Sequence, residues 1–148
     1  MTVRQKEDLA RFAVKKRESK AVYPRPPLKE GEPPRPNPEQ KRSLLRPDKN
    51  MKLSVSHLCG LDDCGVIEEG LKVVEWRIDG EALYGWLEFD ASDVRRVGLG
   101  MEYDNDPPRH AHVVRWPEDS GERRSKGLNL ALRCMPRAVD PALQPSAS

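Results

Sequence analysis

Proline is the feature that most restricts what this chain can fold into. Eight of its 14 prolines fall in the segment from Tyr23 to Pro47. Each proline fixes its own φ and lacks an amide donor, so this segment is predicted to be a linker in extended or polyproline II geometry. Its Pro24-Arg-Pro-Pro27 and Pro33-Pro-Arg-Pro36 motifs are of a kind that aromatic grooves bind, although such motifs are also common in ordinary proline-rich linkers.

The residues before this linker combine a narrow apolar stripe with many basic side chains. Leu9, Phe12 and Ala13 would share one face of a helix over Thr2–Lys20, and basic residues would surround that face. Such a helix could lie on a partner, and the alternative is a solvated terminus. Residues 1–50 are therefore predicted to form a largely disordered basic arm.

Composition narrows the class of protein. A charged fraction of 34% with 5% aromatic residues indicates that part of the chain lies outside a core. The net charge of +2 is too small to predict nucleic-acid binding by the whole molecule. An apolar run long enough to cross a bilayer is absent from the sequence, as is a secretory signal at its N-terminus. Three cysteines suit a reducing compartment, so we predict a cytoplasmic protein.

Residues 51–136 are expected to form a small α+β domain with an antiparallel sheet. Leu53 and Val55 alternate with serines, which predicts a half-buried strand. Leu71–Ile78 and Ala82–Phe89 are joined through Asp79-Gly80 and predict a hairpin. In its second strand Trp86 is a candidate partner-binding aromatic if it faces away from the core, and packing beneath a helix is the alternative.

Two helices are expected in this domain. Asp90 is a suitable N-cap for a short helix over Ala91–Val97, and a strand over Leu99–Tyr103 should follow. A C-terminal helix over Ser125–Met135 would cover the sheet. Its first turn would be crowded with cations, which indicates either an anion or acidic-partner site or a solvated cluster. The cations in question are Arg123, Arg124 and Lys126. Residues 137–148 are expected to be a disordered tail.

The stretch Asp104–Trp116 concentrates the most chemical capacity. An acidic turn closed by two prolines should lead into a strand near Arg109. The two-residue repeat of a strand would place His110 and His112 on one face, with Arg109 and Arg115 on the other. The two imidazoles are then close enough to share a phosphate, a water or a metal ion. The alternative is that both histidines are structural, because a His-x-His pair fixes no third ligand.

A second group of potential ligands lies earlier in the chain. Cys59 and Cys64 follow His57, and thiolate with imidazole suits zinc. Structural zinc sites usually show tighter cysteine pairs and a second pair of ligands. Ordinary half-buried thiols are therefore the simpler interpretation, and the sequence assigns no metal or cofactor.

Three short motifs resemble a diffuse group of small uncharacterised bacterial proteins. The matching stretches are Asp93-Val-Arg-Arg-Val-Gly-Leu99, the turn Asp104-Asn-Asp-Pro-Pro108 and the strand His110-Ala-His-Val113. They cover less than a third of the chain, and here His112 adds a second imidazole to the pattern. The resemblance implies no reaction, but it favours a site around His110.

Two functions follow from these features. In the first, the chain is a small accessory protein that docks a protein or nucleic acid through the basic arm and the α+β domain. In the second, His110 and His112 act as a general acid and base on a phosphodiester. The phosphate would then be held by one or more of four arginines, which are Arg109, Arg115, Arg123 and Arg124. The two functions differ in whether the histidine face packs under the C-terminal helix or opens into a cleft.

Overall fold

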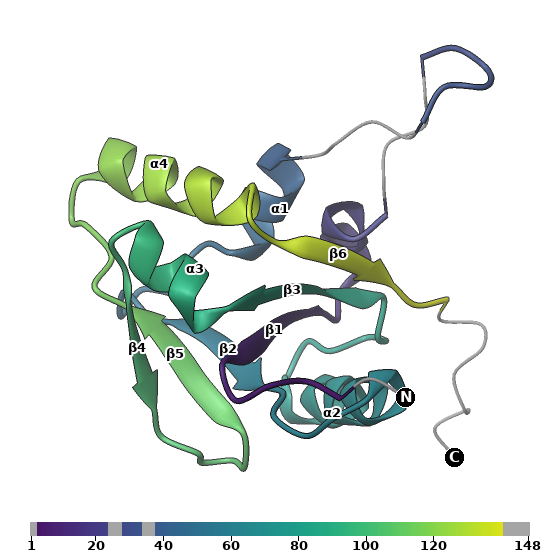
Figure 1. Cartoon of the computed structure of the whole chain (residues 1–148), viewed down its shortest axis with the longest axis horizontal. Coiled ribbons are helices and arrows are strands. Elements are labelled where there is room, and N and C mark those ends of the chain that lie inside the picture. The colour runs from purple at the N-terminus through teal and green to yellow at the C-terminus, as the bar shows by residue number, and fades with distance from the viewer. Residues whose placement is uncertain (1–2, 24–27, 34–37, 141–148) are drawn as a thin grey trace.

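The computed structural model describes residues 3–23, 28–33 and 38–140, and it contains a six-stranded antiparallel sheet with helices on both faces (Figure 1). The strand order is β4-β5-β2-β1-β3-β6, which confirms the predicted α+β class. The strands are β1 (Asp8–Ala13), β2 (Leu53–His57), β3 (Gly85–Asp90), β4 (Gly100–Tyr103), β5 (His110–Val114) and β6 (Met135–Ala138). The helices are η1 (Lys16–Ala21, 3-10), α1 (Pro38–Leu44), α2 (Asp63–Trp76), α3 (Ala91–Arg96) and α4 (Ser120–Ala131).

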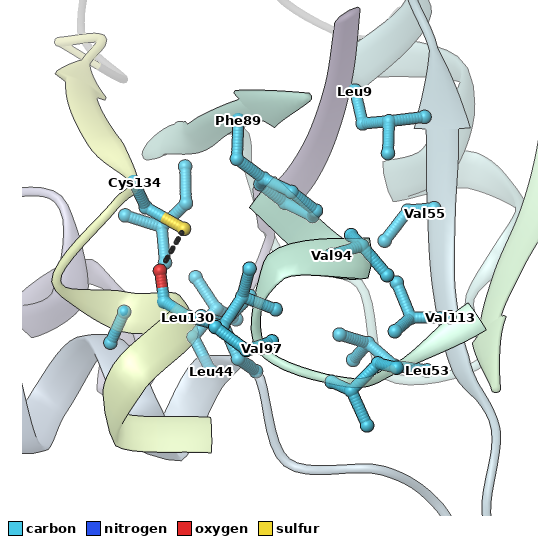
Figure 2. Packing of buried hydrophobic residues seen from close by; sticks show 14 of the residues in the cluster. Leu9, Leu44, Leu53, Val55, Phe89, Val94, Val97, Val113, Leu130 and Cys134 are labelled. Atoms are coloured by element: carbon cyan, nitrogen blue, oxygen red, sulfur yellow. Dashed lines mark hydrogen bonds between the residues drawn. The ribbon is translucent and has the colours of Figure 1, made fainter. Parts of the chain in front are cut away.

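The larger hydrophobic core lies on one face of the sheet. Leu9, Val55 and Val113 come from three neighbouring strands, and they belong to the same buried cluster as Val94 of α3 and Leu130 of α4 (Figure 2). At the edge of this core Cys134 Sγ donates a hydrogen bond to the Leu130 carbonyl at 3.3 Å. Burial raises the pKa of the Cys134 thiol, so this cysteine is an inert core residue.

A smaller core lies on the opposite face, under α2. Phe12 and Trp86 pack with ring centroids 6.3 Å apart, and Val66 of α2 is buried in the same cluster. The Cβ of an alanine at position 70 would lie 2.8 Å from atoms of both Leu83 and Phe12, so Gly70 allows α2 to approach the sheet closely. Helices therefore cover both faces of the sheet, whereas we expected one covering helix.

The predicted disordered arm is wrong for much of its length. Asp8–Ala13 is a strand in the interior of the sheet, paired with β2 on one side and β3 on the other. Leu9 and Phe12 point to opposite cores, and a strand buried on both faces loses the alternation that identifies strands in a sequence. The domain therefore begins well before Met51. The motif at 24–27, most of the motif at 33–36, and residues 141–148 lie outside the described residues.

The predicted hairpin at Asp79-Gly80 is also wrong, because its first half belongs to α2. The Asp62 side chain accepts a hydrogen bond from the Gly65 amide at 2.9 Å and caps the helix. The apolar spacing continues upstream from Leu71 to Val66 and follows the helical repeat. The second half of the predicted hairpin, Ala82–Phe89, contains all of β3 except its last residue, Asp90.

The C-terminal elements are shifted from their predicted positions. Helix α4 begins at Ser120, with Asp119 as N-cap, five residues before the expected start. Its first turn therefore contains Glu122, and the basic residues follow it, so the predicted crowding of cations at the helix start is wrong. Residues 135–138 form the edge strand β6, which pairs with β3. The helix therefore ends before the predicted Met135, and the first two residues of the predicted tail, Arg137 and Ala138, lie in a strand. Pro136 is tolerated there because one side of an edge strand has no partner strand, so an amide that faces this side is not needed for pairing.

Several predicted elements are confirmed. Strand β2 covers the expected Leu53 and Val55, and α3 begins after the Asp90 cap. Strands β4 and β5 flank the Asp-Asn-Asp-Pro-Pro turn and pair with each other. In the part of the chain that the structure describes, no helix is long and apolar enough to cross a membrane.

Candidate functional site

The strands β2 and β5 present a polar row on the face that α2 leaves partly open. His110 lies directly opposite Ser56, and His112 lies opposite Ser54. The two histidines alternate with Ala111 and Val113, which are buried in the larger core on the other face. The prediction that His110 and His112 share one face is therefore right, and this face does not pack under α4.

A groove of about 340 Å³ lies beside this row, and we call it the α2 groove. It forms where β1 leaves β2, since the two strands pair only at Leu9 and Ala10. The Arg11 guanidinium joins the separated strands by donating to the Ser54 carbonyl at 3.0 Å. The groove is lined by Ala10, Arg11, Phe12, Ser54, Val55, Ser56, Val73, Trp76, Arg77, Pro107 and His110.

Two arginines give the α2 groove its charge. Burial, and then the neighbouring Arg77 guanidinium, lower the pKa of Arg11 to about 10, which leaves Arg11 protonated at neutral pH. Arg11 is held by the carbonyls of Leu44 and Ser54. Arg77 lies 3.3 Å from Glu18. Both cations are thus engaged by protein groups before any ligand binds.

The β4–β5 turn brings a carboxylate to the histidines. Asp104 follows β4, and the turn is held by a hydrogen bond from the Asn105 amide to the His110 carbonyl at 2.9 Å. His110 Nδ1 lies 2.8 Å from one Asp104 carboxylate oxygen and 3.0 Å from the other. An ionised carboxylate only accepts hydrogen bonds, so His110 donates from Nδ1.

The second imidazole approaches the same carboxylate. His112 Nδ1 lies 3.8 Å from Asp104, and the two imidazole rings are 4.5 Å apart at an angle of 86°. Unlike His110 Nδ1, the His112 Nδ1 atom is buried and has no hydrogen-bond partner among the described residues. An unpartnered buried polar atom costs roughly 1–3 kcal/mol. We call Asp104, His110 and His112 the histidine–aspartate cluster.

The charges of this cluster are coupled. Burial and the neighbouring His110 lower the pKa of His112, although the Asp104 carboxylate opposes the shift. Burial raises the pKa of Asp104, but the hydrogen bonds from His110 and the Asp106 amide outweigh this effect, so the pKa lies below its usual value. Asp104 is therefore ionised at neutral pH, and His112 favours its neutral form.

This arrangement supports two kinds of chemistry. A carboxylate that holds one nitrogen of an imidazole fixes the tautomer and leaves the other nitrogen able to accept a proton. His110 can thus act as a general base. Three ligand atoms from Asp104, His110 and His112 also lie within 4.8 Å of one another and could hold a metal ion.

The four arginines predicted to hold an anion lie outside the α2 groove. Three of them contact protein carbonyls or a carboxylate, and the fourth packs on a neighbouring strand. Arg109 donates to the carbonyls of His57 and Cys59. Arg123 donates to the carbonyls that follow Trp116, and Arg124 contacts Glu39 at 3.2 Å. Arg115 has φ +67 and its side chain lies over Gly100 of β4. None of the four lines the α2 groove.

The other predicted candidates are not brought together. Trp86 is 3% exposed, and its Nε1 donates to Glu88 at 3.0 Å, so it is a core residue. His57 Nε2 lies 2.9 Å from Asn105 Oδ1. Cys59 and Cys64 are exposed. Within the described residues, the group of possible metal ligands contains none of His57, Cys59 and Cys64.

Sequence reasoning missed the α2 side of the groove. The strand predicted over Leu71–Ile78 contains Trp76 and Arg77, so the sequence did not predict their position in the groove beside His110. The helical spacing from Val66 to Val73 is the signal that would have found them. Asp104 was recognised as a turn residue, but its pairing with His110 depends on the shape of the turn.

A larger hollow of about 600 Å³ lies around Arg4, on another part of the surface. Arg4 is 2.6 Å from Asp63 and 2.9 Å from Glu88. Arg137 also lies 3.7 Å from Asp63, so two arginines balance two carboxylates. We interpret this hollow as part of the ion-pair network that holds the N-terminal residues.

Comparison with known proteins adds no assignment. No protein family matches the sequence, and no similar protein was found among curated proteins or among solved structures. The fold and the cluster define the chain as a small α+β protein with a carboxylate and two imidazoles beside a groove. The resemblance to small bacterial proteins stays a prediction.

Proposed function

We propose that this protein is a small binding or accessory protein that docks a protein partner in the α2 groove. The observation that carries the proposal is the exposure of Trp76, which is 46% exposed at the rim of the groove. Next to it, Ile78 is fully exposed. Tryptophan and arginine side chains at a concave, apolar surface are typical of the residues that contribute most to protein binding.

The lining of the groove favours a protein over a nucleic acid. Phe12, Val73 and Pro107 supply apolar surface, while Ser54, Ser56 and His110 supply a few polar groups. Nucleic-acid binding depends on basic side chains that are free to contact phosphates. Here Arg11 and Arg77 are already engaged by carbonyls and by Glu18.

The docking surface differs from the one expected from the sequence. A free basic arm cannot provide it, because Asp8–Ala13 is an interior strand of the sheet. The α2 groove takes that role in the proposal, and the apolar side chain of a partner segment would enter it. Its volume lies within the range of about 300–1,000 Å³ that is usual for binding pockets.

Site-specific crosslinking in the native cell tests this proposal. A photoreactive residue at Trp76 should give a covalent adduct with a protein, and one at Leu132 should not. Leu132 is a suitable control because it is 68% exposed and does not line the α2 groove. The adduct at position 76 should disappear when Val73→Lys fills the groove. No adduct at position 76, or equal adducts at both positions, would contradict the proposal, and a nuclease-sensitive adduct would replace the protein by a nucleic acid.

A second function, phosphodiester hydrolysis, is favoured by one specific contact. The hydrogen bond of 2.8 Å between His110 Nδ1 and Asp104 orients the imidazole as in other carboxylate–histidine pairs. His110 would act as the general base. His112, whose lowered pKa favours the neutral imidazole, would have to take up a proton before it could act as the general acid. Arg11 and Arg77, and not the four arginines predicted from the sequence, line the same groove as His110. Either one would have to leave its present protein partner to hold the phosphate.

A further inference from the structure

We propose that Asp104, His110 and His112 bind a divalent transition-metal ion of the zinc class, a role that goes beyond docking of a partner. The two histidine ligands come from one strand and the carboxylate from the turn before it. Both Nδ1 atoms face the same carboxylate, at 2.8 Å and 3.8 Å. The inference rests on this convergence.

The spacing of the ligand atoms suits such an ion. Bonds of about 2.0–2.2 Å to nitrogen and oxygen place two ligands of one ion roughly 3–3.5 Å apart. The separations from Asp104 to His110 and His112 lie on either side of this range. All three ligand atoms lie within 4.8 Å of one another. Small movements of the side chains would therefore complete the coordination.

A second observation points to a missing partner for His112. Its Nδ1 atom is buried and makes no hydrogen bond within the part of the chain that the structure describes. Glu102, the cross-strand neighbour of His112, lies 3.0 Å from Lys52 and therefore pairs with that lysine. A metal ion would satisfy the orphaned nitrogen and would neutralise the Asp104 carboxylate in the same step.

The ligand set selects the class of ion. Two imidazoles and one carboxylate suit zinc, iron(II), cobalt(II) or nickel(II), whereas calcium and magnesium prefer oxygen ligands throughout. Three protein ligands leave at least one coordination position for water or another ligand. Because His110 also lines the α2 groove, an ion held by this cluster would lie at the end of the groove.

The hydrogen bond between Asp104 and His110 bears on how the ion would bind. His110 Nδ1 donates to the carboxylate, so its proton must leave before that nitrogen can coordinate a metal. The neutral ring would change tautomer, so that Nδ1 gives up its proton, Nε2 carries one instead, and no net proton is lost from the imidazole. Metal binding and the carboxylate–histidine pair are therefore two alternative states of the same residues.

Metal uptake by the full chain tests the inference. The protein is stripped with a chelator, and cobalt(II) or zinc is added alone in molar excess. Native mass spectrometry should find one bound ion, and cobalt should give a visible spectrum of nitrogen and oxygen ligands without a sulfur-to-metal charge-transfer band. Asp104→Asn and His112→Gln should each weaken binding by more than about 100-fold, because each removes a direct ligand.

Matched variants separate this site from other metal-binding groups. His57→Gln removes the one histidine that is outside the cluster, and Cys59→Ser with Cys64→Ser removes the exposed thiols. These variants should bind the metal ion as tightly as the wild type does. Circular dichroism of each variant establishes that it is folded. A wild-type chain that takes up no ion would overturn the inference, and so would binding that survives Asp104→Asn and His112→Gln or that depends on Cys59 and Cys64.

Discussion

The Nδ1 atom of His110 lies 2.8 Å from a carboxylate oxygen of Asp104, six residues earlier and on the other side of the β4–β5 turn. The turn, in which the Asn105 amide donates to the His110 carbonyl, brings the two side chains together. His112 approaches the same carboxylate from the next outward position of β5. One short turn therefore gives a carboxylate two imidazoles.

Replacing both histidines tests whether they are catalytic. His110→Ala with His112→Ala should lower any hydrolysis of a model phosphodiester by at least about 100-fold, the usual contribution of general acid–base catalysis. The histidine face lies outside both buried clusters, so the free energy of unfolding should fall by only about 1 kcal/mol. Rates are measured on metal-stripped protein, with His57→Gln as the control. A folded double variant that hydrolyses as fast as the wild type would rule out the hydrolase function.

The N-terminal strand β1 can be tested through its single leucine, Leu9. Leu9 is fully buried in the larger core, so Leu9→Ala should lower the free energy of unfolding by about 2–5 kcal/mol. Leu132→Ala, at a position that is 68% exposed, should change it by no more than about 0.5 kcal/mol. Urea denaturation followed by tryptophan fluorescence measures both. Equal, small effects would show that β1 is not part of the folded core. Because β1 pairs with β2 and β3 in the interior of the sheet, a chain lacking residues 1–50 should not fold.

Local signals in the sequence predicted the elements that are exposed on one face. The alternation at Leu53 and Val55, and the cap at Asp90, identified β2 and α3 because each has one polar side. The shared face of His110 and His112 followed from the same two-residue repeat. These features depend only on residues that are close together in the sequence, so one sequence is enough to predict them.

Elements that depend on distant partners were not predictable in this way. Strand β1 is buried on both faces, so its pattern resembles a helical stripe as much as a strand. The run that includes Val73 and Trp76 was predicted to be a strand, but its apolar spacing also fits the end of the helix that the structure shows. The contact of Asp104 with His110 needs the geometry of a turn, which residue spacing alone does not provide.

Gly70 tests how closely α2 packs on the sheet. Alanine is normally favoured over glycine in a helix by about 1 kcal/mol. At position 70, however, its Cβ would lie 2.8 Å from the buried side chains of Leu83 and Phe12, and overpacking costs roughly 1–3 kcal/mol. Gly70→Ala should therefore destabilise the protein, as measured by its thermal midpoint. Gly127→Ala in α4 is the control, because its Cβ would meet the flexible Arg42 side chain at 3.3 Å and Trp116 at an ordinary contact distance of 3.9 Å. A midpoint raised by both changes would contradict the close packing of α2.

The Asp90 cap should make stability depend on pH in a defined direction. Its carboxylate accepts a hydrogen bond from the Asp93 amide at 3.0 Å and another from the Ser92 hydroxyl. Burial raises the pKa of Asp90, but these hydrogen bonds and the charge of Arg96 outweigh it, so the pKa lies below its ordinary value. A carboxyl group whose pKa is lower in the folded state stabilises the fold above its unfolded pKa, and this contribution is lost as the pH falls through the folded pKa. Asp90→Ala should thus cost about 1 kcal/mol at pH 7, and the difference from the wild type should shrink in acid. Urea denaturation at pH 7 and in acid measures this difference in the free energy of unfolding. As a control, Asp90→Ser should recover part of the loss at pH 7, because serine keeps a capping oxygen. A difference that stays constant with pH would show that the charge of Asp90 contributes nothing to the cap.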